Sequence, residues 1–219
     1  ITSYSFPNGS GTGGGNYEQE VGDFDHDGDM DVYGLNWQGF TDVTFQNDGT
    51  GQMLNLTALT SSGSDDNEGD FVDYDNDGDL DLYIANFSGQ DRLYRNELIP
   101  SGTASYTFMS GAIQSFSATS LDGDAGDLDN DGDYDVFIAN DTHHRNVFYE
   151  NTLDPIAASD GFAPVIPNLE QAPDRMPGPE PTVVRAHVYD NAPYYITYYN
   201  PTVLEYSAGG APVQVPMLS

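Results

Sequence analysis

The sequence predicts an all-β chain, and three observations support that prediction. A ten-residue aspartate motif recurs three times along the 219 residues. Around each copy, short runs rich in β-branched and aromatic residues are separated by glycine, asparagine and serine turns, which is typical of strands. No segment repeats its apolar residues at the helical period. The predicted fold class is therefore all-β, built from repeated units.

The three motifs are repeated in register. They read DFDHDGDMDV from Asp23, DYDNDGDLDL from Asp73 and DLDNDGDYDV from Asp127, so they start 50 residues (73 − 23) and 54 residues (127 − 73) apart. Self-similarity at such a period indicates a repeat architecture. Asparagines recur thirteen residues after each first aspartate and at the end of a later run: Asn36, Asn86 and Asn140, then Asn47, Asn96 and Asn151.

An acidic residue also stands three positions before each motif. These residues are Glu20, Asp70 and Asp124. Two roles are open to them: they extend the loop's own ion site, or they bond to a neighbouring unit. We slightly prefer the second role.

Each repeat is predicted to fold as short strands. In the second repeat, GDFVDYD leads into the aspartate loop, LDLYIANF leaves it, DRLYRNEL follows a Ser-Gly turn and SYTFMSG closes the unit. The first repeat shows four such runs, and the third shows three with no clear fourth strand. Four strands in about 50 residues is the size and pattern of a β-propeller blade. We therefore expect three four-stranded, propeller-type blades.

The composition excludes several classes of partner and site. The chain has 36 acidic and five basic residues and a formal charge of −31, so it repels nucleic acid and anionic membranes and favours a cation. Cysteine is absent, which excludes disulfides and thiolate chemistry. No apolar run reaches the length of a membrane span. Because the chain starts at Ile1 with no signal-like segment, we interpret it as a processed protein or an excised piece.

The aspartate loop is predicted to bind a metal ion. In residues 73–81 an aspartate stands at every second position, where like charges repel. Gly78 at position six permits a sharp turn over an ion, Asp79 at position seven can offer its main-chain carbonyl, and Asp81 at position nine can close the sphere. This all-oxygen set suits calcium. Magnesium is second choice, because it demands a tighter octahedron, and zinc prefers nitrogen or sulfur. A merely solvated acidic turn is the alternative, and the threefold repetition argues against it.

An EF-hand does not explain the loop. That motif needs an acid at position twelve and a helix on each side. Position twelve is Gly34, Ile84 or Ile138, and the following runs are β-branched and aromatic, so the loop is predicted to join two strands. Position four differs among the copies, which indicates an outward-facing side chain; its residues are His26, Asn76 and Asn130.

The pattern D-x-D-x-D-G-x-x-D, followed by an aliphatic strand and LYRN, resembles the FG-GAP/VCBS repeat of secreted bacterial proteins and integrin-type β-propellers. The resemblance covers roughly residues 17–152. It implies one calcium ion per loop, about three in all, held between the first two strands of each blade. In that family the position-seven ligand is a main-chain oxygen, so the carboxylates of Asp29, Asp79 and Asp133 are free to point to solvent. The implied ligands are Asp23, Asp25, Asp27, Asp29 and Asp31; Asp73, Asp75, Asp77, Asp79 and Asp81; and Asp127, Asp129, Asp131, Asp133 and Asp135.

The chain divides into three predicted segments. Seven of the thirteen prolines lie in the middle segment, which indicates an extended, semi-rigid linker. Four strand-like runs follow it and weakly resemble the opening half of an immunoglobulin-like sandwich, which needs about seven strands. The segments are an FG-GAP/VCBS repeat region at 1–154 (loops 23–31, 73–81 and 127–135), the linker at 155–181 and a partial immunoglobulin-like module at 182–219.

Three blades and a partial sandwich leave open edges. Closed propellers have about four to eight blades, so the array is cut short, completed by other chains or stacked openly. The strand-like ITSYSF at residues 1–6 can pair with an open edge of another copy. We therefore expect an oligomer or fibre formed by strand complementation, unless a longer chain supplies the missing strands.

The predicted function is a secreted, extracellular, calcium-binding structural or adhesive module without enzymatic activity. No nucleophile–base–acid set and no phosphate-binding glycine loop occurs in the sequence. A carbohydrate-binding propeller is the alternative. A polysaccharide-acting enzyme is less favoured, because its basic cluster is missing from a chain with five scattered arginines. The expected partners are calcium, a second copy or another extracellular protein, and carbohydrate in the alternative.

Overall fold

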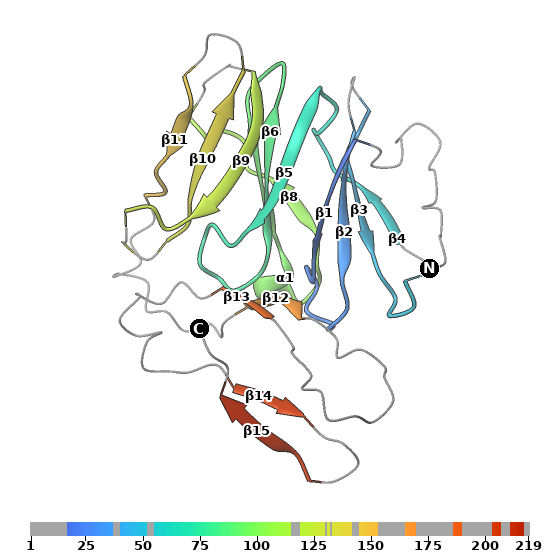
Figure 1. Ribbon diagram of the computed structural model, residues 1–219. Helices are drawn as coiled ribbons and strands as arrows, with labels where there is room; N and C mark the ends of the chain where they lie inside the picture. The colour runs from blue at the N-terminus through green and yellow to red at the C-terminus, as the bar shows by residue number, and fades with distance from the viewer. Residues whose placement is uncertain are drawn as a thin grey trace.

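The structure, a computed structural model, describes the three repeats and four short strands beyond them. The described residues are 17–36, 40–51, 55–114, 119–129, 131, 133–141, 145–152, 165–169, 186–189, 203–206 and 211–216. They form antiparallel sheets with one short helix, α1 (Leu98–Ser101), which confirms the all-β prediction (Figure 1). Among these residues no helix has the length and apolar character that a membrane span requires.

Each repeat folds as one antiparallel meander. The first sheet has the order β1-β2-β3-β4, the second β5-β6-β7-β8 and the third β11-β10-β9. The strands lie on the runs predicted from the sequence. Their bounds are β1 Glu18–Gly22, β2 Asp31–Leu35, β3 Val43–Gln46, β4 Asn55–Ala58, β5 Asp66–Val72, β6 Asp81–Asn86, β7 Arg92–Asn96, β8 Tyr106–Phe108, β9 Ser120–Gly126, β10 Asp135–Asn140 and β11 Val147–Tyr149.

The three sheets stand side by side in chain order, and their first strands β1, β5 and β9 are neighbours (Figure 1). Alternate side chains of β6 point to opposite faces of the second sheet. Leu82 and Ile84 pack with Tyr33 of the first sheet, whereas Tyr83 packs with Ile138 of the third. Every residue of β6 is therefore buried, and this explains its nearly continuous apolar sequence.

In the first and second sheets, an aromatic ring on the second strand, β2 or β6, packs against a glycine of the next sheet. A Cβ atom on Gly69 would lie 2.5 Å from Cε1 of Tyr33, and one on Gly123 would lie 2.9 Å from Cε1 of Tyr83. Real Cβ atoms do not approach other heavy atoms so closely. Glycine in these strands therefore permits close approach of the neighbouring sheet.

The repeated asparagines link each sheet to the loop of the sheet before it. Nδ2 of Asn96 donates to the carbonyl oxygen of Phe24 at 2.8 Å, and Nδ2 of Asn151 donates to that of Tyr74 at 2.7 Å. Phe24 and Tyr74 occupy position two of the first and second aspartate loops. The sequence register of these asparagines therefore reflects a contact between neighbouring sheets.

A buried carboxyl pair lies between the first two sheets. Asp66 forms an ion pair with Arg92 at 2.5 Å. Asp42 accepts hydrogen bonds from the Asn36 amide at 2.7 Å and from Oη of Tyr33 at 3.2 Å. Burial and the nearby Asp66 charge raise the pKa of Asp42, whereas Arg92 opposes the effect of burial on the pKa of Asp66. Asp42 is therefore the member of the pair that holds a proton more readily.

Four short strands are described beyond the repeats. β12 (Val165–Leu169) pairs with β13 (Ala186–Tyr189), and β14 (Val203–Tyr206) pairs with β15 (Val213–Pro216). The β14–β15 hairpin lies apart from the three repeat sheets (Figure 1). β12 lies within the predicted linker, and β13, β14 and β15 lie on three of the four predicted C-terminal strands. The remaining predicted strand, at 194–200, lies outside the described residues, and the domain boundaries stay predictions.

The close contact between Tyr33 and Gly69 leads to a prediction about the stability of a Gly69 variant. Gly69→Ala places a methyl group 2.5 Å from Cε1 of the Tyr33 ring and should destabilise the chain by about 1–3 kcal/mol, as overpacking does in a tight core. Gly126→Ala is the matched control, because a Cβ there meets no atom within 4 Å. Urea unfolding followed by circular dichroism measures both variants. Equal unfolding midpoints would contradict the packing described between the first two sheets.

The buried Asp42 carboxyl makes a pH prediction. Its pKa is raised in the folded chain, so folding stability declines as pH rises from the ordinary aspartate value toward that raised pKa. Asp42→Asn removes the titration and retains an acceptor for the Asn36 amide. From mildly acidic to mildly alkaline pH, the melting temperature of this variant should decline less steeply than that of the unsubstituted chain. The corresponding difference in the free energy of unfolding is at most about 1.4 kcal/mol per pH unit. Parallel pH profiles for the two proteins would show that Asp42 does not bind this proton.

Candidate metal centre

Each aspartate loop joins the first two strands of its sheet. The loops connect β1 to β2, β5 to β6 and β9 to β10, and no helix flanks them. The prediction of a strand–loop–strand unit is confirmed, and an EF-hand is excluded.

The aspartate at position nine anchors each loop. These residues, Asp31, Asp81 and Asp135, are at most 1% exposed. In each, Oδ2 accepts a hydrogen bond from the backbone amide of the position-two residue, at 3.1, 3.1 and 3.0 Å, respectively. Oδ1 accepts the backbone amide of the repeated asparagine that follows the third strand, at 2.8, 2.7 and 2.9 Å. One carboxylate therefore ties the start of the loop to the far end of the sheet.

The aspartates at positions one and five accept hydrogen bonds from backbone amides of their own loop. Asp73 accepts the amides of Asp77 and Gly78 at 3.1 and 3.0 Å, and Asp77 accepts the amide of Asp79 at 3.0 Å. The first loop repeats all three bonds between equivalent residues. In the third loop, the described residues repeat the bonds from Asp131 to Asp127 and from Asp133 to Asp131. These bonds turn several carboxylates toward one centre.

Three carboxylates in each loop converge closely enough to share an ion. One oxygen from each lies within 4.8 Å of the other two. The sets are Asp23, Asp25 and Asp27; Asp73, Asp75 and Asp81; and Asp127, Asp129 and Asp135. Position nine belongs to the second and third sets and not to the first. The remaining predicted ligands, Asp29, Asp31, Asp77, Asp79, Asp131 and Asp133, lie in the same loops outside these sets.

The loop glycines adopt the backbone conformation expected of them. Gly28 and Gly78 both have φ of 95°, a region that side chains penalise. Gly132 lies outside the described residues. The expectation of an outward-facing position four holds for His26, which is exposed, but is wrong for Asn76, which is 5% exposed. Both residues have positive φ, of 60° and 58°, and this explains why asparagine suits the position.

The carboxylates at position seven do not all point to solvent. Asp79 is fully buried and Asp133 is 1% exposed, so the expectation of solvent-facing side chains is wrong for both. Oδ2 of Asp79 accepts the amide of Ile99 at 2.8 Å. Within the described part of the chain, no hydrogen-bond donor reaches Oδ1 of Asp79, either carboxylate oxygen of Asp133 or Oδ1 of Asp75. Buried carboxylate oxygens without donors are costly, so they call for a cation or a proton.

The loops are electrostatically suited to a cation. Burial, followed by the charges of neighbouring aspartates, raises the pKa of Asp133 to about 7. Burial also raises the pKa of Asp31 and Asp73 to about 7, although amide hydrogen bonds oppose it. Without a counter-ion these three carboxyls therefore take up a proton more readily than exposed aspartates do. An oxygen-ligated divalent cation fits this donor set, because it replaces the protons and balances the carboxylate charges.

Two side chains beside the loops were not predicted. Gln46 donates from Nε2 to Asp25. Burial raises the pKa of Asp75 and Asp77. The charge of Arg95, the equivalent residue of the second repeat, partly opposes that rise, and Arg95 pairs with Glu97 at 2.7 Å. Both residues precede a repeated asparagine. That placement is visible in the sequence, but the residue type changes between repeats and does not indicate a contact with the loop.

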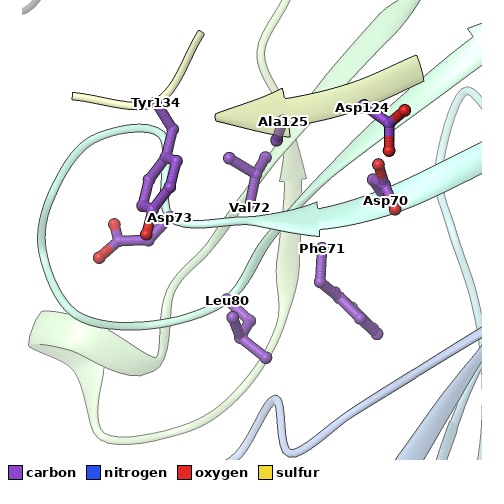
Figure 2. A pocket seen from close by; sticks show the side chains of 8 residues that line it. All are labelled: Asp70, Phe71, Val72, Asp73, Leu80, Asp124, Ala125 and Tyr134. Carbon is purple, nitrogen blue, oxygen red and sulfur yellow. The ribbon is translucent and has the colours of Figure 1, made fainter. Parts of the chain in front are cut away.

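A small cavity separates the second and third sheets. It measures about 120 Å³ and lies between β5, β9 and the second loop. Figure 2 shows the carboxylates of Asp70 and Asp124 directed toward one another at its rim. Burial raises the pKa of Asp70 to about 7, and the charges of Glu20 and Asp124 on the adjacent sheets add to the effect. These acids therefore approach one another between sheets, and a bond from them to a neighbouring unit stays a prediction.

Comparison with known families agrees with this geometry. A family model described as the FG-GAP-like repeat matches residues 23–84 and 73–138. Together the matches cover 116 residues (138 − 23 + 1), more than half of the 219. The chain belongs to the FG-GAP-like repeat family. FG-GAP repeats are typical of extracellular structural and adhesive proteins. A search of curated proteins finds no match to the chain.

The positive φ of the loop glycine in this FG-GAP chain leads to a prediction about metal affinity. Gly78→Ala forces a side chain into φ of 95°, which costs about 1–2 kcal/mol. The affinity of the second loop for calcium should fall about tenfold, since 1.4 kcal/mol corresponds to a factor of ten. Asn76→Ser should also weaken it, because serine favours positive φ less than asparagine. Isothermal titration measures both variants, and unchanged binding in both would contradict the loop geometry.

Proposed function

We propose that this FG-GAP chain is an extracellular, calcium-binding structural or adhesive module whose three sheets are propeller-type blades. The observation that supports the proposal best is the set of buried carboxylate oxygens at Asp75, Asp79 and Asp133 that no described donor reaches. Three loops of the same construction make a single accidental cluster a poor explanation. No enzymatic activity is proposed, because the converging carboxylates are accounted for by ion binding.

Calcium suits the loops better than other common cations. All candidate ligands are oxygen atoms, and calcium accepts six to eight of them in a flexible sphere. Magnesium requires a smaller octahedron and retains water, whereas the loop carboxylates are numerous and already converge. Zinc prefers imidazole or thiolate; the chain has no cysteine, and the only histidine in the three motifs is the exposed His26.

In the second and third sheets, the bound ion would stabilise the sheet through the position-nine aspartate, which belongs to the converging carboxylates there. That residue contacts both the start of the loop and the end of the third strand, so an ion at the loop fixes three parts of one sheet. In the unfolded chain these parts are far apart, and binding is therefore linked to folding. A structural module in a calcium-rich medium would gain rigidity in this way.

Carbohydrate binding is the second candidate. The cavity between the second and third sheets combines acidic rim residues with Tyr134 and apolar walls, which is a lining that sugars use (Figure 2). Its volume of about 120 Å³ is well below that of ordinary ligand sites, which begin near 300 Å³. The structural role is therefore preferred.

Self-assembly by strand complementation remains part of the proposal. The third sheet has three strands among the described residues, so β11 is an edge there, whereas β3 and β7 each have a further neighbour. An edge strand accepts an extended segment from another chain. The proposed donor, residues 1–6, lies outside the described residues.

Calcium removal tests the proposed function. The melting temperature should fall sharply in chelator and recover in excess calcium, with less recovery in magnesium. A site filled at a hundred times its dissociation constant contributes about 2.7 kcal/mol. Differential scanning calorimetry measures the shift, and Asp81→Asn should reduce it. Superimposable melting curves with chelator and with calcium would overturn the proposal.

A further inference from the structure

The residue before each repeated asparagine that follows a third strand lies beside the aspartate loop of its own sheet. These three residues, which we call the tuning positions, are Gln46, Arg95 and Glu150. In every repeat the backbone amide of the following asparagine donates to the position-nine aspartate, at 2.8, 2.7 and 2.9 Å. Because that bond fixes the backbone next to the loop, the three tuning positions have the same place relative to their loops.

In the first and second repeats, the side chain at the tuning position acts on the position-three aspartate of the loop. Gln46 donates from Nε2 to Oδ2 of Asp25. Burial raises the pKa of Asp75, the equivalent aspartate of the second loop, and the charge of Arg95 partly opposes that rise. Asp25 and Asp75 both belong to the converging carboxylates. The tuning position therefore influences a candidate ligand without being one itself.

The charge at the tuning position changes from one repeat to the next. Glutamine is neutral, arginine is positive and glutamate is negative, whereas all three loops carry the same five aspartates. Arg95 pairs with Glu97 at 2.7 Å, so part of its charge is compensated. The side chain of Arg95 is 36% exposed and Glu150 is exposed, so salt screens the effect of both charges on the loops.

The arginine stands beside the loop whose first aspartate is the most buried of the three. Asp73 is 8% exposed, whereas the equivalent Asp23 is less deeply buried and Asp127 is exposed. Repulsion between carboxylates is stronger where water is excluded. A positive charge beside the second loop reduces this repulsion when no ion is bound, and the same charge repels an incoming cation.

We propose that the side chain at the tuning position sets how strongly its own loop binds calcium, so that Arg95 weakens the second site and Glu150 strengthens the third. Gln46 holds Asp25 by a neutral hydrogen bond and leaves the charge of the first loop unchanged. The inference rests on the proposed function, because it requires that the loops bind calcium. It goes further by naming residues outside the loops that determine the relative affinities of the three sites.

Calcium titration of the full chain, followed by nuclear magnetic resonance, tests the proposal loop by loop. The backbone amides of Asp27, Asp77 and Asp131 each donate to the position-one aspartate of their own loop at 3.1 Å, so their signals report on the three loops separately. Arg95→Gln should tighten calcium binding at the second loop by roughly threefold to tenfold at low salt, as expected for nearby charges at a protein surface. In about 1 M salt the gain should fall below about twofold, because the Debye length is then about 3 Å.

Matched variants separate the effect of charge from that of shape. Arg95→Lys retains the charge and should leave the affinity of the second loop nearly unchanged. Glu97→Gln leaves Arg95 uncompensated and should weaken calcium binding at the second loop, and Glu150→Gln should weaken it at the third. Arg145→Gln is the control, because exposed Arg145 follows β10 at the end of the third sheet that lies away from the loop.

The possible outcomes distinguish this proposal from the proposed function. Calcium affinity at the second loop that Arg95→Gln leaves unchanged or lowers overturns the proposal, as does a gain that persists in high salt. An equal gain from Arg145→Gln, or an unchanged third loop in Glu150→Gln, also overturns it. If calcium moves none of the three amide signals in the unsubstituted chain, the proposed function itself fails.

Discussion

The position-nine aspartates set the constraint on which the rest of the structure depends. Asp31, Asp81 and Asp135 are buried carboxylates, each bonded to one amide at the start of its loop and one beyond the third strand of its sheet. A buried carboxylate is tolerated only where donors or cations surround it. The loop must therefore curl, the second strand must start at that aspartate, and the third strand must end beside it. The repeat length and the order of the strands follow from this arrangement.

Packing between sheets depends on the same unit. Once the loop is formed, alternate residues of the second strand face the two neighbouring sheets, and the ring of Tyr33 or Tyr83 reaches a glycine across the interface. Apolar burial supplies the attraction, and glycine permits the close approach. The acids of β1, β5 and β9 gather along the same line, which adds like charge to an interface that is otherwise apolar. Apolar contact thus holds the sheets together, and repulsion between carboxylates opposes their association.

The sequence predicted the local features well because they repeat. The strand order, the positive φ of the described loop glycines and the convergence of loop aspartates are each readable within a few residues. Predictions failed where a side chain meets distant parts of the chain. Asp79 is buried because Ile99 and its surroundings cover it, and Asn76 is buried in a left-handed turn. The contact of Gln46 with Asp25 joins residues 21 positions apart, and the residue type is not kept between repeats. No local pattern encodes such contacts.

The repeated asparagines connect the three loops into one continuous network. Asn96 bonds through its side chain to Phe24 of the first loop and through its backbone amide to Asp81 of the second. Asn151 joins the second loop to the third in the same way, through Tyr74 and Asp135. If the loops bind ions as proposed, rigidity gained in one loop lowers the entropy that the next loop must lose on binding. The three proposed sites would then fill cooperatively, with a binding curve steeper than that of three separate sites. Damage to the middle loop should reduce affinity at both of its neighbours.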